Sequence, residues 1–297
     1  MRRRRKLLIL TGCSFAALVL LMVAKRECEP SYDGRSLSEW VHVCSCRKPE
    51  RPTYDEREKA AQAIRHIGTN AIPTLLRWIS YDPSQARKTS LALLRHLPKA
   101  LQPQFLWERE ARAFETQVAF YTLGTAARSA IPALTHLAIT SSGEERVYYC
   151  SRALSYIGPE ALPAMLTITS NPQGKARACP LPMLFIFRTE ARSAVPFLVA
   201  CLNDKEDAVA CAAAEVLGYL TLSNAVVVPA LAASLQSTNA ARRAHAARGL
   251  AEFGRAAEAV APQLQQLLSD PSQSARSEAR RALEQIAPEA LTHAPAM

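Results

Sequence analysis

Apolar residues recur at helical spacing along most of the chain, and a proline recurs with them at a nearly constant interval. Seven prolines lie one turn inside an apolar stretch, namely Pro73, Pro103, Pro132, Pro163, Pro196, Pro229 and Pro262. Their spacings are 30, 29, 31, 33, 33 and 33 residues. Proline is tolerated in the first turn of a helix, because the N–H that it lacks would have no partner there. Each proline therefore predicts the start of a helix, which we name helix B.

A second apolar stretch with helical spacing precedes each helix B, and we name it helix A. Several of these stretches end in a glycine, at Gly68, Gly124, Gly158 and Gly254. Glycine readily takes the left-handed conformation that closes many helices. The chain is therefore predicted to repeat a unit of two antiparallel helices about every 31 residues.

The turn after helix B carries a second repeated signal. Asp82-Pro83 is followed by Arg87, Asn171-Pro172 by Arg177, Ser237 by Arg243, and Asp270-Pro271 by Arg276. Asp, Asn and Ser favour turns and helix caps. The Arg that follows five or six positions later, in the next helix A, is predicted to reach back to the turn. The segment from Asp204 to Ala210 lacks this Arg, so the pairing is not expected in every unit.

One helix pair of this length cannot bury its apolar faces alone, whereas stacked pairs share a continuous core. We predict seven units from about Asp55 to Ser269, followed by an eighth helix A, Ser272 to Ile286, that covers the end of the stack. Helix A of the fifth unit departs from the pattern, because it contains Pro180 and Pro182. These prolines predict a shortened or kinked helix.

Two segments, SDPSQSARSEARRALEQIAPEAL and DKEDAVACAAAEVLGYL, resemble HEAT repeats, specifically the short HEAT-like repeats of phycobilisome-lyase-type proteins. The resemblance extends over about 80% of the chain. It implies an all-α fold, a right-handed α–α superhelix of the HEAT/armadillo type, in which the B helices line the concave face. The segment Tyr32 to Trp40 resembles a lead-in found before such repeats in some exported bacterial proteins. Its residues Leu37 and Trp40, with Val41, are expected to cover the open end of the first unit.

The first 26 residues form a basic leader with an apolar core. Five cationic residues, Arg2 to Lys6, precede an apolar run of 18 residues from Leu7 to Ala24. As a helix this run is about 27 Å long, close to the hydrocarbon thickness of a bilayer. We therefore expect an N-terminal hydrophobic helix that anchors the chain in the bacterial inner membrane, with the N-terminus in the cytoplasm and the repeats outside.

Two alternatives for the leader stay open. Cleavage as a signal peptide would release a secreted or periplasmic protein, and Leu10 to Cys13 resembles a bacterial lipobox whose Cys13 is lipidated. The predicted domains are residues 1–26 (cytoplasmic stub and membrane segment), 27–54 (a Cys-containing lead-in and cap) and 55–297 (the repeat array).

The charge of the chain is concentrated in the leader. The full chain has a formal net charge of +10, but the leader contributes seven basic residues and no acidic one. Residues 27–297 then contain 29 basic and 26 acidic residues. A nucleic-acid-binding surface requires clustered Lys and Arg. We therefore expect no nucleic-acid partner.

The sequence offers little for catalysis. His66 and His96 occupy the same place in adjacent units, where stacked helices are about 10 Å apart, so they cannot readily share one metal ion. No His-x-x-x-His pair, Gly-rich phosphate loop or nucleophile elbow is present. We expect no catalytic residue, no metal, no cofactor and no small-molecule substrate.

The cysteines fall into two groups. One group lies on apolar helix faces and is predicted to be core: Cys150, Cys179, Cys201 and Cys211. Cys28, Cys44 and Cys46 lie in the lead-in. Outside the cytoplasm, Cys28 can form a disulfide with Cys44 or Cys46. A Cys-x-Cys metal site and free thiols are the alternatives.

The B helices offer the best candidate for a binding surface. Apolar positions two or three and five or six after each proline are predicted to face inward, so the position four after it faces outward. In the first three units that position holds Arg77, Trp107 and His136, residue types that often anchor partners. We predict a ridge of these three side chains. The alternative is that Trp107 packs between units and the other two are solvated.

Together these features predict a non-catalytic, membrane-anchored scaffold that binds a protein or peptide through the concave face of the solenoid. One alternative is a chromophore-lyase-like enzyme or its accessory subunit, implied by the repeat subtype. A second alternative is a nucleic-acid-binding HEAT-like protein.

Overall fold

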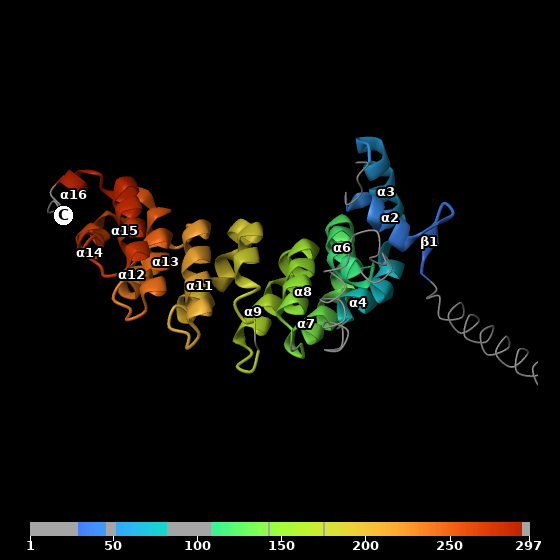
Figure 1. The fold of residues 1–297 in the computed structure, drawn as a ribbon, viewed down its shortest axis with the longest axis horizontal. Coiled ribbons are helices and arrows are strands. Elements are labelled where there is room, and N and C mark those ends of the chain that lie inside the picture. Colours follow the sequence, from blue (N-terminus) through green and yellow to red (C-terminus); the bar gives the residue numbers. More distant parts are fainter. Residues whose placement is uncertain (1–28, 46–51, 82–107, 142, 175, 293–297) are drawn as a thin grey trace, which may run out of the picture.

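The computed structural model describes residues 29–45, 52–81, 108–141, 143–174 and 176–292. In these residues the chain forms an elongated, arched row of helix pairs that runs from the N-terminal segment at one end to the C-terminus at the other (Figure 1). The expected hydrophobic helix at 7–24 and the second helix B, with Pro103, lie outside the described residues. Within the described ranges, no helix is both long and apolar enough to cross a membrane.

The lead-in begins with a small hairpin and a helix. Strands β1 (Ser31–Tyr32) and β2 (Arg35–Ser36) pair antiparallel, and Asp33 and Gly34 between them both have positive φ, as two-residue hairpin turns require. Helix α2 (Leu37–Cys44) follows, with a capping box between Ser36 and Glu39.

Helix α2 covers the end of the array, as the sequence predicts. It packs on α3 (Tyr54–Ile67) and α6 (Glu108–Leu123). Leu37, Trp40 and Val41 are at most 2% exposed. The Trp40 indole N–H donates to the carbonyl of Tyr32 at 3.0 Å, which ties the hairpin to this cap.

The described A and B helices alternate along the stack. The A helices are α3 (Tyr54–Ile67), α6 (Glu108–Leu123), α8 (Glu144–Ile157), α11 (Asp207–Leu220), α13 (Ala240–Ala251) and α15 (Gln273–Ile286). The B helices are α4 (Ile72–Ser80), α7 (Ile131–Ile139), α9 (Leu162–Ser170), α10 (Val195–Cys201), α12 (Asn224–Ser234) and α14 (Ala261–Leu267). Consecutive A helices pack on one another, as α11 on α13 and α13 on α15. This confirms a solenoid-like row of helix pairs.

Five of the described units contain a 3-10 helix before helix B, and the unit of α11 and α12 has none. The 3-10 helices are η1 (Gly68–Ala71), η4 (Gly124–Ala130), η5 (Pro159–Ala161), η6 (Leu181–Ala194) and η7 (Gly254–Val260). The predicted glycines Gly68, Gly124, Gly158 and Gly254 all have positive φ at this turn. Five of the repeated prolines then lie in the first turn of helix B, at Pro73, Pro132, Pro163, Pro196 and Pro262.

Pro229 is the exception, and the prediction that it lies in the first turn of its helix B is wrong. Helix α12 begins at Asn224, so Pro229 lies inside the helix. In this unit Thr221 and Ser223 both have positive φ and complete the turn early. The amides of Val226 and Val227 then donate to the carbonyl of Ser223, at 2.8 and 3.0 Å, and start the helix five residues before the proline.

The fifth unit has no α-helix in its A position within the described residues. Turns over 176–180 lead into η6, a 3-10 helix that contains Pro182. Two prolines without N–H donors account for this departure, and it confirms the predicted interruption. The backbone of Arg188 leaves the helical region altogether, with φ 47° and ψ −116°.

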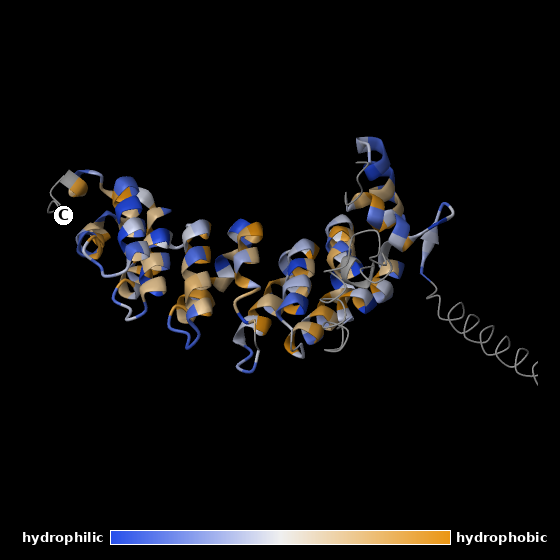
Figure 2. Cartoon of the chain, viewed as in Figure 1, coloured by the Kyte–Doolittle hydropathy of each residue, from blue (hydrophilic) through white to orange (hydrophobic). Residues whose placement is uncertain are grey.

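The core lies between the two layers of helices, and the B helices show the predicted inward and outward positions. The residue two after each described proline has no exposed surface: Leu75, Leu134, Met165, Leu198, Leu231 and Leu264. The residue four after it is exposed in each described unit. Apolar positions lie on the inner sides of the helices, and polar turns protrude along one edge of the row (Figure 2).

That polar edge contains the predicted arginines. Arg243 donates to the carbonyls of Ser237 and Thr238 at 2.7 and 3.1 Å, and Arg276 donates to those of Asp270 and Pro271 at 2.7 and 3.0 Å. Arg177 reaches back to the carbonyl of Thr169 at 2.8 Å. The predicted return of the Arg to its own turn is therefore confirmed for these three, and the fourth, Arg87, lies outside the described residues.

The same arginines also bridge to the next unit. Arg177 forms an ion pair with Asp204, and Arg243 with Asp270. The turn at Asp204 is the one whose own helix A, α11, lacks the repeated Arg. There Arg242 from α13, the next helix A, donates to the carbonyl of Asp204 at 2.6 Å instead. This chain of contacts links successive turns along the edge.

At the C-terminal end, α15 begins and ends close to the predicted bounds. A short helix that the sequence pattern does not indicate, α16 (Glu289–Thr292), follows and contacts α14. The Gln265 side chain donates to the carbonyl of Ala290 at 2.7 Å and holds α16 against the last unit.

Candidate functional site: an aromatic band and an open cleft

The predicted ridge is placed only in part. Arg77 and His136 are exposed on α4 and α7, four residues after their prolines, and Trp107 lies outside the described residues. The Arg77 guanidinium donates to the Thr74 hydroxyl at 3.2 Å. The ridge therefore stays a prediction.

The cysteines predicted to be core lie in or beside it. Cys150, Cys201 and Cys211 are buried and Cys179 is partly buried. Burial raises the pKa of the Cys150 thiol to about 12 and that of Cys201 to about 11, so both stay protonated and unreactive at neutral pH. The predicted disulfide involves Cys28 and Cys46, which lie outside the described residues; the third cysteine, Cys44, is partly buried at the end of α2.

The structure shows another surface feature, a row of exposed or partly exposed aromatic side chains, four of which lie near the end of their A segment. We name this row the aromatic band and define it as Tyr121, Tyr148, Tyr156, Phe185 and Tyr219. Tyr121 is 70% exposed, and Phe185 and Tyr219 are each 53% exposed. Only 6% of the chain is aromatic, so five such residues on one edge are a marked concentration.

The repeat register explains why these residues form a row. Tyr121, Tyr156, Phe185 and Tyr219 each lie two or three residues before the left-handed residue that ends their helix. Helices α6, α8, η6 and α11 pack in succession, so these equivalent positions follow one another along the edge. The rings of Tyr121 and Tyr156, in adjacent units, are 5.3 Å apart and perpendicular.

Arg152 lies within the band. Its guanidinium donates to the hydroxyls of Tyr148 (3.0 Å) and Tyr156, and it lies 5.7 and 5.3 Å from the centres of their rings. Among the described residues Arg152 has no carboxylate partner, because tyrosine oxygens and ring faces take that place. These hydrogen bonds and cation–π contacts hold the guanidinium against the two rings.

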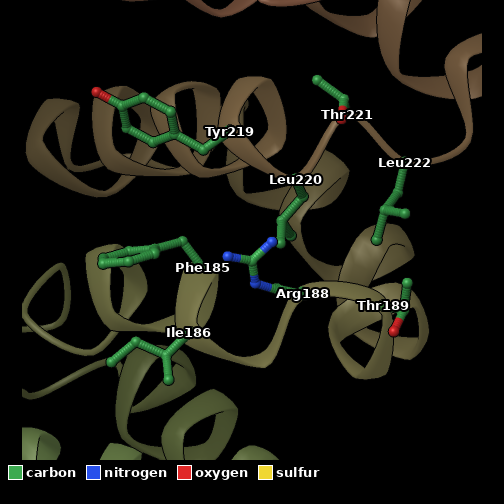
Figure 3. Close-up of a pocket in the computed structure, with 8 residues that line it drawn as sticks. All are labelled: Phe185, Ile186, Arg188, Thr189, Tyr219, Leu220, Thr221 and Leu222. Atoms are coloured by element: carbon green, nitrogen blue, oxygen red, sulfur yellow. The ribbon is translucent and has the colours of Figure 1, made fainter.

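At its C-terminal end the band borders an open cleft of about 1020 Å³ between the fifth and sixth units. One wall comes from η6 and the other from the end of α11 and the turn after it. The lining residues are Phe185, Ile186, Arg188, Thr189, Tyr219, Leu220, Thr221 and Leu222. Figure 3 shows the Arg188 guanidinium in the middle of the cleft, between Phe185 and Leu220.

Two residues of the cleft have left-handed backbone conformations without being glycine. Arg188 has φ 47° and Thr221 has φ 46°. Both lie eight residues before their proline, where two other units have Gly124 and Gly254 with φ 51°. Backbone of this kind costs about 1–3 kcal/mol for a residue with a Cβ and is concentrated at functional sites.

Sequence reasoning does not find Arg188, Phe185 or Tyr219. Glycine marks the end of helix A in four of the seven units, and the second, fifth and sixth units carry no such mark; the turns of the fifth and sixth lie in the described residues. Alignment of the units on the position eight before the proline is the signal that identifies them, because Arg188 and Thr221 occupy a place for glycine. The aromatic residues then follow as the last outward positions of their helices.

Comparison with known proteins supports the repeat assignment. The HEAT repeat model matches residues 194–223, which span α10 and α11 and so form one side of the cleft. No curated protein matches the chain.

Several solved structures are similar to the chain at low identity. The complex of CpcE and CpcF of phycocyanin lyase from Nostoc sp. PCC7120 is 22% identical, covering 52% of this chain and 98% of that chain, with a TM-score of 0.46. An engineered protein is 20% identical, and the match covers 84% of this chain and 78% of the engineered chain, with a TM-score of 0.40. A designed armadillo repeat protein in complex with the peptide (KR)4 is 15% identical and covers 84% and 99%, with a TM-score of 0.31.

The matched segment contains a helix B with proline in its first turn, α10, followed by a helix A, α11, and the same order of helices recurs in α7 to α8, α12 to α13 and α14 to α15. Residues 194–223 are thus a HEAT repeat, and the protein is a HEAT-repeat protein with a solenoid-like stack of such helix pairs.

Proposed function

We propose that the protein is a non-catalytic scaffold that binds a partner protein or peptide along the aromatic band. The observation that supports this proposal is the exposure of Tyr121, Phe185 and Tyr219 along one edge of the stack, with the partly exposed Tyr156 between the first two. Large exposed apolar patches on soluble domains mark interaction sites, and aromatic residues and Arg are enriched in the centres of protein interfaces.

The proposal replaces the predicted ridge as the first candidate surface. The ridge offers Arg77 and His136 on separate helices, with small or neutral residues at Thr167 and Ala200 in the following units. The band instead presents an aromatic side chain in each of four successive A positions. A partner that lies across several units gains from contacts spread along the row.

Site-specific photo-crosslinking in the native host tests the proposal. A photo-reactive phenylalanine at Tyr121 or Tyr219 should yield a crosslinked partner. Tyr54 is the matched control, because it is 80% exposed on α3 but lies outside the band. Crosslinks from His136 and none from Tyr121 or Tyr219 would favour the ridge and contradict the proposal.

We also propose that residues 7–24 anchor the chain in the inner membrane and that the array lies outside the cytoplasm. The support is the leader sequence, with its basic start and apolar run. An alkaline phosphatase fused to the C-terminus should be active in cells, because the enzyme needs an oxidising compartment. The same fusion without residues 1–26 should be inactive; equal activity of the two would refute the anchor.

A further inference from the structure

We propose that the cleft at the end of the aromatic band binds an acidic side chain of a partner peptide, with Arg188 as the group that recognises the carboxylate. The inference rests on the proposed function, since it names a chemical feature of the partner that would bind along the aromatic band.

The first observation is that Arg188 has no partner of its own. Among the described residues it makes no ion pair and no hydrogen bond, and it is exposed. The nearest acidic residue on its own element, Glu190, accepts a hydrogen bond from the Thr189 hydroxyl instead. Other arginines of the array are paired, Arg177 of the same unit with Asp204 and Arg248 on α13 with Glu278.

The second observation is the surroundings of the guanidinium. Phe185, Ile186, Leu220 and Leu222 form an apolar lining, and Figure 3 shows the guanidinium between Phe185 and Leu220. An ion pair formed against apolar walls is less screened than one in water. The cleft therefore favours an anion that brings an apolar group with it.

The third observation is the backbone of Arg188. A glycine at this position would adopt φ 47° without strain, as Gly124 and Gly254 do in their own units. The structure instead keeps a long cationic side chain on a left-handed residue. Strain that the fold retains next to a cleft indicates a role in binding.

The shape of the guanidinium selects the anion. Its planar fork donates two parallel hydrogen bonds to a carboxylate, and the hydroxyl of Thr221 on the cleft wall offers a further donor. One arginine among apolar residues is a poor match for a nucleic acid, which requires several cations in a row. An Asp or Glu next to a large apolar residue, in a segment that continues along the band, fits both parts of the surface.

A displayed library of random dodecapeptides, selected on the immobilised full chain, tests this inference. We expect enrichment of peptides with an Asp or Glu beside a Leu, Phe or Trp. Fluorescence anisotropy then compares the most enriched peptide with its Asn or Gln counterpart, and we expect the amide form to bind at least ten-fold more weakly.

Variants of the protein separate the charge from the fold. Arg188→Gln keeps the side-chain length and the backbone requirement, so it should fold as the wild type does and bind the peptide at least ten-fold more weakly. Arg188→Lys keeps the charge but not the planar fork, so its affinity should lie between that of the wild type and that of Arg188→Gln. Arg192→Gln, on the same element and exposed, is the matched control and should leave the affinity unchanged.

The outcomes distinguish the inference from the function on which it rests. Enriched peptides without an acidic residue that lose affinity in Tyr219→Ala would refute the carboxylate site and keep the band as the binding surface. Peptides that bind independently of Arg188, Tyr121 and Tyr219, or no enriched peptide at all, would refute both. Arg188-dependent binding of a single-stranded oligothymidylate in place of peptide would also overturn the inference.

Discussion

At the residue scale, two glycines set how closely neighbouring units approach. Gly218 on α11 and Gly249 on α13 face each other across the contact between these helices. A Cβ on Gly218 would lie 2.6 Å from the Cα of Gly249, and a Cβ on Gly249 would lie 2.6 Å from the carbonyl oxygen of Ala214. Both neighbours are backbone atoms, so neither can move aside without shifting a helix.

We predict that Gly218→Ala lowers the free energy of unfolding by about 1–3 kcal/mol, because overpacking forces the helices apart. Helix propensity alone would favour Ala over Gly by about 1 kcal/mol, so the two effects have opposite signs. Urea denaturation followed by circular dichroism measures the difference. Gly143→Ala is the control, since its Cβ would meet only the Ser141 hydroxyl at 3.9 Å. A stabilised Gly218→Ala variant would contradict the close contact.

A second residue-scale prediction concerns the strain at Arg188. Arg188→Gly should raise the free energy of unfolding by about 1 kcal/mol, because glycine takes the left-handed conformation freely. Arg192→Gly, on the same element but with ordinary backbone, should lower it by about 0.5–1 kcal/mol. The same denaturation assay compares them, and a loss of stability in both variants would show that Arg188 is not strained.

Single residues were the hardest part to predict from the sequence. Cys150, Leu75 and the glycines at the turns follow from repeat position and residue type, and the structure confirms them. The role of Arg188 does not follow from the sequence, because an arginine in an amphipathic segment usually indicates a position exposed to solvent. The turn of this unit places the residue in a left-handed conformation, and an arginine gives no sign of that conformation in the sequence.

At the scale of elements, proline in the first turn explains most of the B helices, and Pro229 shows what happens elsewhere. It lies inside α12 and cannot donate to the carbonyl of Ala225, one turn earlier. The prediction from the proline register fails here because two left-handed residues, Thr221 and Ser223, begin the helix early.

A proline inside a helix and a proline in the first turn of a helix can be compared in a matched pair of variants. Pro229→Ala should raise the free energy of unfolding by about 1–2 kcal/mol, since it restores a helical hydrogen bond that outweighs the added freedom of the unfolded chain. Pro163→Ala, in the first turn of α9, restores no bond and should lower it by about 0.4–1 kcal/mol. Thermal denaturation of both variants checks the signs, and equal effects would contradict the placement of Pro229.

The turns between elements carry a dependence on pH. The Arg243 guanidinium, 2.7 and 2.8 Å from the carboxylate of Asp270, holds the pKa of that carboxyl below its usual value. The folded state then binds fewer protons than the unfolded state in the acidic range. The stability from this pair is therefore complete above the unfolded pKa near 3.9 and is lost as the pH falls through the folded pKa.

We predict that Asp270→Asn lowers the free energy of unfolding by about 2 kcal/mol at pH 7, because it leaves Arg243 without its charged partner. The difference from the wild type should shrink as the pH falls from 5 towards 3. Urea denaturation at pH 7, 5 and 3 measures it. Asp55→Asn, exposed in the first turn of α3, serves as the control, and a constant difference over this range would rule out the proposed linkage.

At the scale of the whole molecule, each unit contacts mainly its neighbours along the row. The period of the prolines predicts this arrangement. A stack of helix pairs leaves apolar surface at both ends, and this predicts the lead-in cap and the final helix A. The 3-10 helix of the fifth unit and the addition of α16 were less predictable in form, because they depend on how one unit accommodates its own prolines and chain end. A surface such as the aromatic band emerges only when equivalent positions of several units are lined up.

Because contacts are local, damage to one unit should stay local. In Gly218→Ala, hydrogen exchange should accelerate in α11 and α13 and remain unchanged in α3 and α4 at the far end of the row. Mass spectrometry of peptic fragments resolves these helices. Uniform acceleration along the chain would show that the molecule unfolds as a single cooperative body.

The walls of the cleft belong to two different units, η6 on one side and the end of α11 on the other. A molecule bound between them holds both walls at one separation, and by mass action it stabilises that joint over any other angle. The bend of the entire row would then depend on whether this one joint is occupied. In mechanical terms, a ligand in the cleft would act as a brace across this joint.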